Sequence, residues 1–248
     1  MWDDAKQLNA IAAGLASIAA LMLLWGAAAW TVRQPIFDFR EVVVRGSLER
    51  ASAAHLEAVI RGELAGTLFT LNFDGARASL SRVPWVRGVT LRRLWPQRLE
   101  VTIEEHVPLA RWSGGGLVNI QGEVFLADYN GELPRFDGPD GSAPDLAAHL
   151  REWSKVLEPV ALDIAALRLS PRGGWRIDAE GGSGTIAIEL PHEDATARLA
   201  HFVSVYDRTI GALARARTQV EQVDLRYHNG FAARVPGFRE RAAKKAAA

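Results

Sequence analysis

The chain has 248 residues, which is enough for one membrane anchor and one or two small domains at roughly 100–200 residues per domain. Its hydrophobic content of 48% is that of a globular protein and excludes both a largely disordered chain and a polytopic membrane protein. Basic and acidic residues balance at 29 each, so no net charge attracts nucleic acid, and the absence of cysteine excludes disulfides, thiolate metal sites and cysteine nucleophiles.

The first predicted element is a transmembrane helix over residues 10–32. This stretch carries no charged residue and exceeds the roughly 20 residues that a helix needs to cross the hydrocarbon core. Trp25 and Trp30 lie toward one end, where indole rings favour the headgroup region. One alternative is a cleaved signal peptide, because residues 27–29 form a small-residue cleavage site, but the run is longer than the roughly 7–15 residues of a signal h-region. The other is a buried core helix, which rarely runs this long without one polar face. We expect a retained anchor behind a short tail, residues 1–9.

The charges around this segment do not settle its orientation. Lys6 stands alone before the span, whereas Arg33, Arg40 and Arg45 follow it, which taken by itself favours a cytoplasmic C-terminal part. Long domains, however, often translocate regardless of charge. The flanking charges therefore do not decide on which side of the membrane each part of the chain lies.

The region after the anchor predicts a strand, two helices and a hairpin. Residues 40–46 (REVVVRG) form a short β-branched strand, Ser52 can cap a helix to about Leu64, and Asp74 can cap a second short helix that ends by Pro84. The hairpin has its bend at residues 95–97. Its second strand alternates strictly, with Leu99, Val101 and Ile103 on one face, so we expect a sheet with one covered face.

A second region begins near residue 108 and also mixes strands with helices. The predicted elements, in chain order, are a strand–turn–strand over Leu117–Phe125, a loop over Pro134–Pro144, a helix capped by Asp145 and running to about Leu157, a hairpin over Leu167–Asp178, a strand over Thr185–Leu190, a helix after Asp194, and two short strands or one bent strand over Val223–Val235. The basic tail, residues 239–248, is expected to be disordered.

Signals for catalysis are weak. Six scattered histidines lack the HExxH spacing that places two imidazoles on one helix face, and no P-loop occurs. The GxGxxA match at residues 182–187 leads into a strand-like run, so no helix N-terminus is available for a pyrophosphate. Glu104 and Glu105 are adjacent in a strand and point to opposite faces, so they cannot work as a pair. We expect no catalytic residue, cofactor, metal, nucleic acid or small-molecule substrate.

Strand edges are the remaining candidates for function. An unpaired edge offers backbone donors and acceptors to which a partner's extended segment can add by β-augmentation. The alternative is that these edges are blunted and inert.

Several motifs in order resemble the FtsQ/DivIB family of bacterial cell-division proteins, which carry a POTRA domain. The residues that carry the resemblance are Val42–Gly46, Arg82–Val86, Val89–Pro96, Glu104–Trp112 ("E-x-x-P-x-A-R-W"), Leu117–Phe125 ("LVD-x-x-G-x-x-F") and Val223–Tyr227 with Gly230 ("DLRY-x-x-G"). The resemblance implies an α+β fold: a transmembrane helix (10–32), a POTRA domain (36–107) and a mixed β domain with flanking helices (108–238).

The resemblance also implies a role and partners. FtsQ-like proteins are non-catalytic scaffolds of the septum that sit in the inner membrane with a cytoplasmic N-terminus and periplasmic domains. They bind FtsB and FtsL, with FtsK, FtsW and FtsI as further partners. In this chain Arg226, Tyr227, Gly230, Phe231 and Val235 match the FtsB-docking strand, where Val235 stands in place of the aromatic often found there and Phe231 is the candidate substitute.

The POTRA hairpin supplies a second implied contact. Leu91 and Arg93 match the strand that contacts the DNA translocase FtsK in the family. Two rival functions remain at this point: a POTRA-bearing secretion or assembly factor, which would need further POTRA repeats or a β-barrel, and an anchored periplasmic enzyme, which would need a pocket of perturbed ionisable groups.

Overall fold

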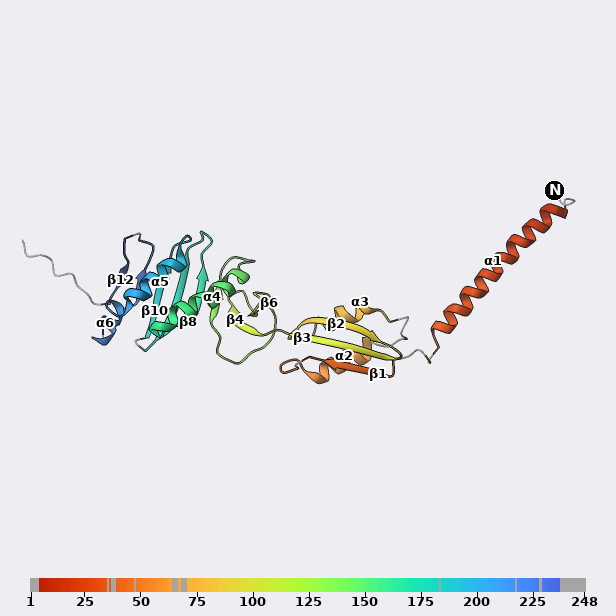
Figure 1. Cartoon of the computed structure of the whole chain (residues 1–248), viewed down its shortest axis with the longest axis horizontal. Helices are drawn as coiled ribbons and strands as arrows, with labels where there is room; N and C mark the ends of the chain where they lie inside the picture. The colour runs from red at the N-terminus through yellow and green to blue at the C-terminus, as the bar shows by residue number, and fades with distance from the viewer. Residues whose placement is uncertain are drawn as a thin grey trace, which may run out of the picture. The chain divides into compact units, whose positions relative to one another are not determined.

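The computed structural model describes residues 5–34, 36, 39–46, 48–63, 67, 71–182, 184–216, 218–227 and 229–236. The expected tail at 239–248, residues 1–4, Pro35, Leu64 and His228 lie outside the described residues. The chain divides into two compact units, Met1–His106 and Val107–Ala248, which are described separately below (Figure 1).

The first element is α1 (Ala5–Val32), a helix of 28 residues. Within it, Asn9–Val32 is long and apolar enough to cross a membrane by length and composition, although a signal sequence meets the same criteria. Its large apolar side chains, such as Leu23 and Trp25, are exposed. The helix therefore has an apolar surface on every side, as expected of a segment that meets lipid rather than a protein core.

The rest of the first unit is a three-stranded sheet with two helices. The elements are β1 (Glu41–Arg45), α2 (Ala53–Glu63), α3 (Phe73–Leu80), β2 (Val86–Leu94) and β3 (Arg98–Glu105). The sheet order is β1-β3-β2, with β1 parallel and β2 antiparallel to β3. The predicted order of elements and the bend at residues 95–97 are confirmed, and Leu99, Val101 and Ile103 are all buried.

The caps of the two helices follow the sequence in one case and depart from it in the other. The amide of His55 donates to Ser52 Oγ at 3.3 Å, as predicted for α2. The prediction that Asp74 caps α3 is wrong, because Asn72 occupies the N-cap and accepts the amide of Gly75 at 3.0 Å. Asp74 instead lies in the first turn, where its charge favours the positive end of the helix dipole.

The second unit is built on a nine-stranded mixed sheet. Its elements are β4 (Pro108–Trp112), β5 (Leu117–Asn119), β6 (Val124–Phe125), β7 (Arg135–Asp137), α4 (Ala143–Leu157), a 3-10 turn (Glu158–Val160), β8 (Asp163–Leu169), β9 (Trp175–Gly181), β10 (Gly184–Leu190), α5 (Ala195–Tyr206), α6 (Ile210–Arg215), β11 (Gln222–Asp224) and β12 (Ala232–Arg234). The sheet order is β12-β11-β10-β9-β8-β7-β4-β5-β6. The α+β class is confirmed.

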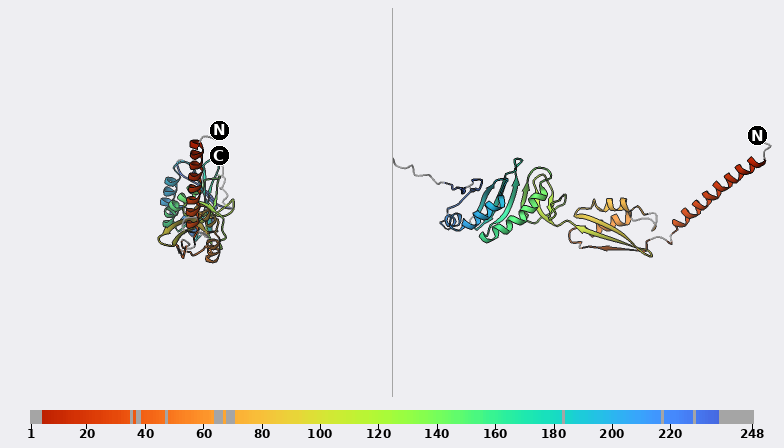
Figure 2. Two further views of the ribbon diagram at one scale, coloured as in Figure 1. Left: turned by 90° about the vertical axis from the view of Figure 1, so that its right-hand side faces the viewer. Right: turned by 45° about the horizontal axis from the view of Figure 1, so that its top comes forward.

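Helices α4 and α5 lie on one face of this sheet (Figure 2). Trp153 of α4 is fully buried and donates its indole N–H to the hydroxyl of Thr196 on α5 at 2.9 Å. Phe136, Leu167, Ile177 and Ile188 supply the facing side of the core. The opposite face of the sheet is polar, which is typical of a mixed sheet covered on one side.

Two predictions for this unit are wrong in detail. The stretch 134–144 is not all loop, since β7 lies within it and pairs in parallel with both β4 and β8. Helix α4 begins at Ala143 rather than after an Asp145 cap, with Pro144 in its first turn, where the missing N–H of proline costs nothing. The helix α6 was not predicted. For residues 223–235, the structure selects two short strands over one bent strand.

Candidate partner-binding site

The candidate site lies at the β12 end of the large sheet. Strand β11 is held in place by Val223 and Leu225, which are buried in the core, and it pairs in parallel with β10. Strand β12 then pairs antiparallel to β11 and is the last strand of the sheet. Its three residues, Ala232–Arg234, are all exposed. The other side of β12 is therefore an open edge within the part of the chain that the structure describes.

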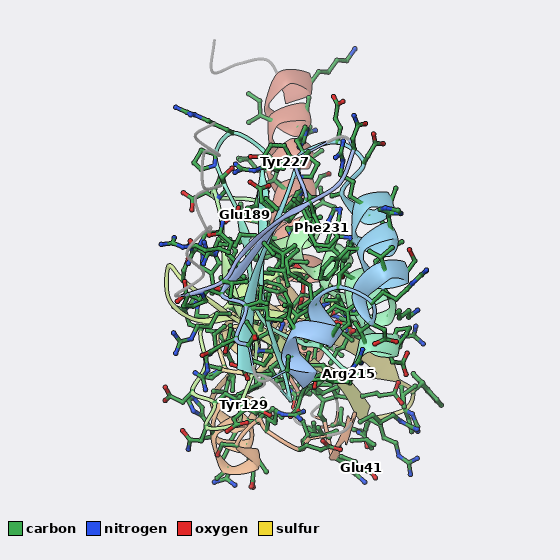
Figure 3. The ribbon with its side chains drawn as sticks, turned by 90° about the vertical axis from the view of Figure 1, so that its left-hand side faces the viewer. Glu41, Tyr129, Glu189, Arg215, Tyr227 and Phe231 are labelled. Carbon is green, nitrogen blue, oxygen red and sulfur yellow. The ribbon has the colours of Figure 1, made fainter. Side chains whose placement is uncertain are left out.

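The connection between β11 and β12 contains the two residues that the sequence placed in a docking strand. Arg226 and Tyr227 come after the end of β11 and do not join the ladder. The side chain of Tyr227 is 60% exposed (Figure 3). The alternative that Tyr227 is a core residue is therefore wrong, and its ring offers apolar area and a hydroxyl at the surface.

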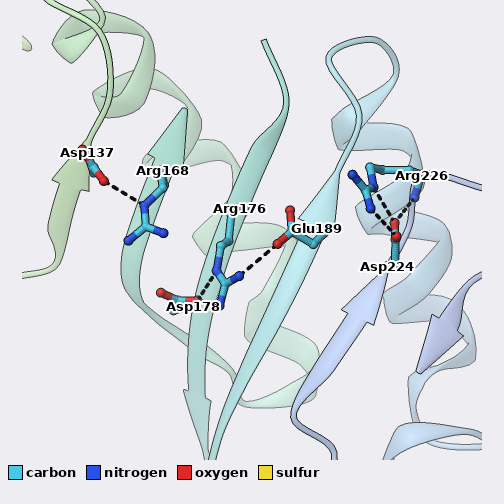
Figure 4. Close-up of polar contacts among 7 residues, drawn as sticks. All are labelled: Asp137, Arg168, Arg176, Asp178, Glu189, Asp224 and Arg226. Carbon is cyan, nitrogen blue, oxygen red and sulfur yellow. Dashed lines mark hydrogen bonds and ion pairs between the residues drawn. The ribbon is translucent and has the colours of Figure 1, made fainter. Parts of the chain in front are cut away.

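Arg226 is fixed by a neighbour two residues earlier. Its Nε and Nη2 donate to the carboxylate of Asp224 at 2.9 and 2.6 Å, and its backbone N–H donates to the same group at 3.0 Å (Figure 4). These hydrogen bonds outweigh partial burial and hold the pKa of Asp224 below its ordinary value, while the Asp224 carboxylate raises the pKa of Arg226. Asp224 thus orients a charge that remains more than half exposed.

A second arginine fixes the backbone of the same connection from the helix side. Nη1 of Arg198, on α5, donates to the carbonyl oxygens of Leu225 at 3.1 Å and Tyr227 at 2.7 Å. A cleft of about 480 Å³ lies beside this contact and is lined by Arg198, His201, Tyr227 and Gly230 among others. The two bonds from Arg198 hold the backbone of Leu225 and Tyr227 to α5, which lowers the entropy lost at these residues when a partner binds.

Phe231 and Val235 are half-buried and pack against the core of the unit. The ring of Phe231 packs edge-on against Phe202 of α5, with centroids 5.6 Å apart, and Val235 also packs against the core. Gly230 has open space where a side chain would lie. The five residues carried over from the family are thus brought together, but only Arg226 and Tyr227 present side chains outward.

The polar sheet face continues the site away from the edge. Asp137, Arg168, Arg176, Glu189 and Asp224 lie in register on five adjacent strands, β7 to β11. Burial alone would lower the pKa of Arg176, but its contacts with Asp178 and Glu189, both at 3.0 Å, raise it (Figure 4). Two of the neighbouring pairs, Asp137 with Arg168 and Arg176 with Glu189, carry opposite charges, which stabilises a sheet. The other two pairs, Arg168 with Arg176 and Glu189 with Asp224, carry like charges, and each of these four side chains has an ion-pair partner of opposite sign.

The residues implied for the POTRA hairpin differ in what they expose. The side chain of Leu91 is buried, so at this position only the backbone of β2 is available at the edge. Arg93 lies with its guanidinium 4.3 Å from the centre of the Phe73 ring, a cation–π geometry that stacks it on α3.

Sequence reasoning missed Asp224 and Arg198 as parts of the site. The alternation of a strand places Asp224 and Arg226 on one side, so their opposite charges were a readable signal. Arg198 is 27 residues from Leu225, and no local pattern indicates that contact. Among the described residues, no three His, Asp or Glu side chains gather as a metal site.

The two units match family models. Residues 37–106 match the FtsQ-type POTRA domain, and residues 110–226 match the C-terminal domain of the cell-division proteins FtsQ and DivIB. A cell division protein FtsQ from Nitrosospira multiformis is 36% identical over 239 residues, covering 94% of this chain and 99% of the relative. The chain belongs to the FtsQ family of cell-division proteins.

Further FtsQ proteins match at similar lengths. The one from Burkholderia pseudomallei is 36% identical over 250 residues and covers 96% of both chains, and the one from Neisseria gonorrhoeae is 27% identical over 236 residues, covering 94% and 95%. These matches extend over both units, so the FtsQ resemblance seen in the motifs is confirmed over most of the chain.

Proposed function

We propose that this FtsQ-family chain is a non-catalytic scaffold of the divisome that links early and late assembly at the septum. Residues 10–32 anchor it in the inner membrane, residues 1–9 lie in the cytoplasm, and the POTRA domain (36–107) and β domain (108–238) lie in the periplasm. Family membership and the one candidate span among the residues that the structure describes support this arrangement.

The proposed mechanism is strand addition at β12. An extended segment of FtsB pairs with the open edge of Ala232–Arg234 through backbone hydrogen bonds, and FtsL binds together with FtsB. The observation that carries the proposal is that this edge adjoins a fixed loop that presents Tyr227 outward. The two alanines of β12 offer a partner little side-chain contact, so specificity comes from the loop.

Arg226 and Tyr227 have different roles in this scheme. The oriented guanidinium of Arg226 binds a partner carboxylate, because a planar donor that is already held in place loses little conformational entropy when it forms a charge-assisted hydrogen bond. Tyr227 provides apolar contact and one hydroxyl, the combination that makes tyrosine frequent at interface hot spots. Gly230 keeps the approach to the edge free of side chains.

A second partner surface is proposed on the POTRA domain. FtsK contacts the β2 edge through Arg93 and through the backbone at Leu91. FtsW and FtsI are further proposed partners, and no residue of the chain is assigned to them.

The partner proposal is tested by co-purification of the full-length chain, extracted in detergent, with FtsB and FtsL. Tyr227→Glu places a negative charge where acidic partner contacts are expected and should abolish recovery of both proteins. Leu126→Glu is the matched control, since Leu126 is 79% exposed next to β6 at the other end of the same sheet. Equal recovery with both variants would reject β12 as the docking edge.

Topology and anchor retention are tested separately. External protease on intact spheroplasts should digest residues 33–248, and full protection of that part would reject the proposed orientation. Mass spectrometry of the purified chain should find no N-terminus at Trp30, whereas a chain beginning there would show that the apolar helix is a cleaved signal.

A further inference from the structure

Strand β1 of the first unit is an edge strand with an unusual composition. Its five residues, Glu41–Arg45, read EVVVR, and in the described part of the chain they pair only with β3. Figure 1 shows β1 along the border of the smaller sheet. Val42 and Val44 lie opposite Leu99 and Val101, on the same face as those buried side chains, yet they are 38% and 40% exposed. The strand thus exposes β-branched side chains to water next to an edge whose backbone hydrogen-bonding groups can pair with another strand.

The order of the charges in this strand is self-complementary. If two copies of β1 run antiparallel with Val43 at the centre, Glu41 of each copy faces Arg45 of the other, and Val42 faces Val44. A two-fold axis through Val43 pairs residues 41, 43 and 45 of one copy with residues 45, 43 and 41 of the other, and residues 42 and 44 with 44 and 42. Backbone N–H and C=O groups of the two copies therefore face each other whichever of these two sets points to the open edge. Opposite charges and β-branched pairs directly across strands both stabilise antiparallel pairing.

The ion pairs inside the unit leave this arrangement intact. Glu41 accepts from Arg98 Nε at 2.7 Å, and Arg45 Nε donates to Glu100 at 2.7 Å, with every one of these side chains except Glu100 more than half exposed. All four lie on the face opposite to Val42 and Val44. Pairing of two copies therefore joins their ion pairs into a row of side chains with alternating charge. The row runs from Arg98 and Glu41 of one copy to Arg45 and Glu100 of the second copy.

We propose that the open edge of β1 is a self-association surface, on which a second copy of this chain adds its own β1 antiparallel about Val43. The two three-stranded sheets then form one six-stranded sheet. An interface of this size is weak in solution, but anchoring both copies in one membrane raises their effective concentration. The surface does not use β12, so it leaves the proposed FtsB edge available.

The absence of cysteine makes the pairing measurable. Val43→Cys in the full-length chain, placed in lipid vesicles and oxidised, positions two thiols across the axis, where facing Cα atoms lie about 4.5–5.5 Å apart, within disulfide range. Thr90→Cys is the matched control, since Thr90 is exposed in mid-strand on β2, the other edge of the same sheet. We expect at least fivefold faster dimer formation with Val43→Cys, and equal rates would overturn the proposal.

The register has its own test, which also serves if Val43→Cys disturbs folding. Val42→Cys and Val44→Cys should each cross-link slowly alone, because like positions lie on a diagonal, and faster when mixed, because positions 42 and 44 of the two copies face each other. Mixtures no faster than the single variants would reject pairing about Val43. A thermal melt of each variant shows whether the unit remains folded.

Charge swaps separate contacts between copies from those within one chain. In the Val43→Cys background, Glu41→Arg or Arg45→Glu should each slow cross-linking by roughly fivefold, since like charges then face each other. The double variant Glu41→Arg with Arg45→Glu restores opposite charges between copies although it disrupts both internal pairs. We expect it to recover cross-linking. A double variant slower than either single one would overturn the proposal.

Discussion

The two short edge strands β1 and β12 expose different things to a partner. β1 has charges at both ends and valines between them, so its side chains alone define an antiparallel match. β12 reads AAR, and two of its three exposed side chains are methyl groups. An edge strand with small side chains cannot select a partner by itself, so neighbouring residues must supply the specificity. For β12 these are the loop residues that Asp224 and Arg198 hold in place.

The largest effect on partner binding is expected from a change at the exposed loop residue Tyr227. Tyr227→Ala should weaken FtsB binding by about 2 kcal/mol, or roughly 30-fold, if Tyr227 is a hot spot. The melting temperature should not change, because a side chain that is 60% exposed contributes little to the core. Binding measured with the full-length chain, beside a thermal melt, checks both; a lowered melting temperature with normal affinity would contradict it.

The backbone contribution of β12 can be removed without changing the loop. Ala232→Pro and Ala233→Pro each delete one N–H, and adjacent residues in a strand direct their N–H groups to opposite sides. One variant should lose a bond to β11 and melt earlier. The other should melt normally and bind FtsB about tenfold more weakly, since a net hydrogen bond contributes roughly 0.5–1.5 kcal/mol. Normal binding by both variants would exclude strand addition at this edge.

Substitutions at Phe231 show whether this aromatic side chain stabilises the folded unit or contacts the partner. Its ring packs on Phe202, so Phe231→Ala should lower the free energy of unfolding by about 1 kcal/mol and move the melting temperature accordingly. Phe231→Leu keeps apolar area and should recover most of this loss. A variant that melts normally but loses FtsB would instead assign Phe231 to the interface.

The smallest expected effect concerns pH. Because the pKa of Asp224 is lower in the folded chain, its contribution to stability is complete above the ordinary carboxyl pKa of about 4 and is lost as the pH falls through the folded value. In Asp224→Asn the melting temperature should depend less on pH at acid pH. The same change should reduce FtsB binding a few-fold at neutral pH, because Arg226 is no longer held by the Asp224 carboxylate. An unchanged acid slope in Asp224→Asn would contradict this assignment.

The sequence predicted what local periodicity specifies. The alternation of Leu99, Val101 and Ile103 indicated a half-covered strand, and the structure buries all three. It did not predict β7, because a three-residue strand between glycines and prolines owes its existence to parallel partners on both sides. At the candidate site, Arg226 and Tyr227 were found through the motif alone. The contacts that hold them were not predicted, because Arg198 lies on another element and the motif does not include a pairing of Asp224 with Arg226.

The row of charges across β7 to β11 also affects how a partner arrives. Asp137, Arg168, Arg176, Asp178, Glu189, Asp224 and Arg226 nearly cancel, with three positive and four negative groups in close pairs. Paired charges produce little potential beyond a Debye length, which is about 8 Å at physiological ionic strength. These paired charges therefore exert little long-range electrostatic attraction, and the association rate of a partner at the adjoining loop should be nearly independent of salt.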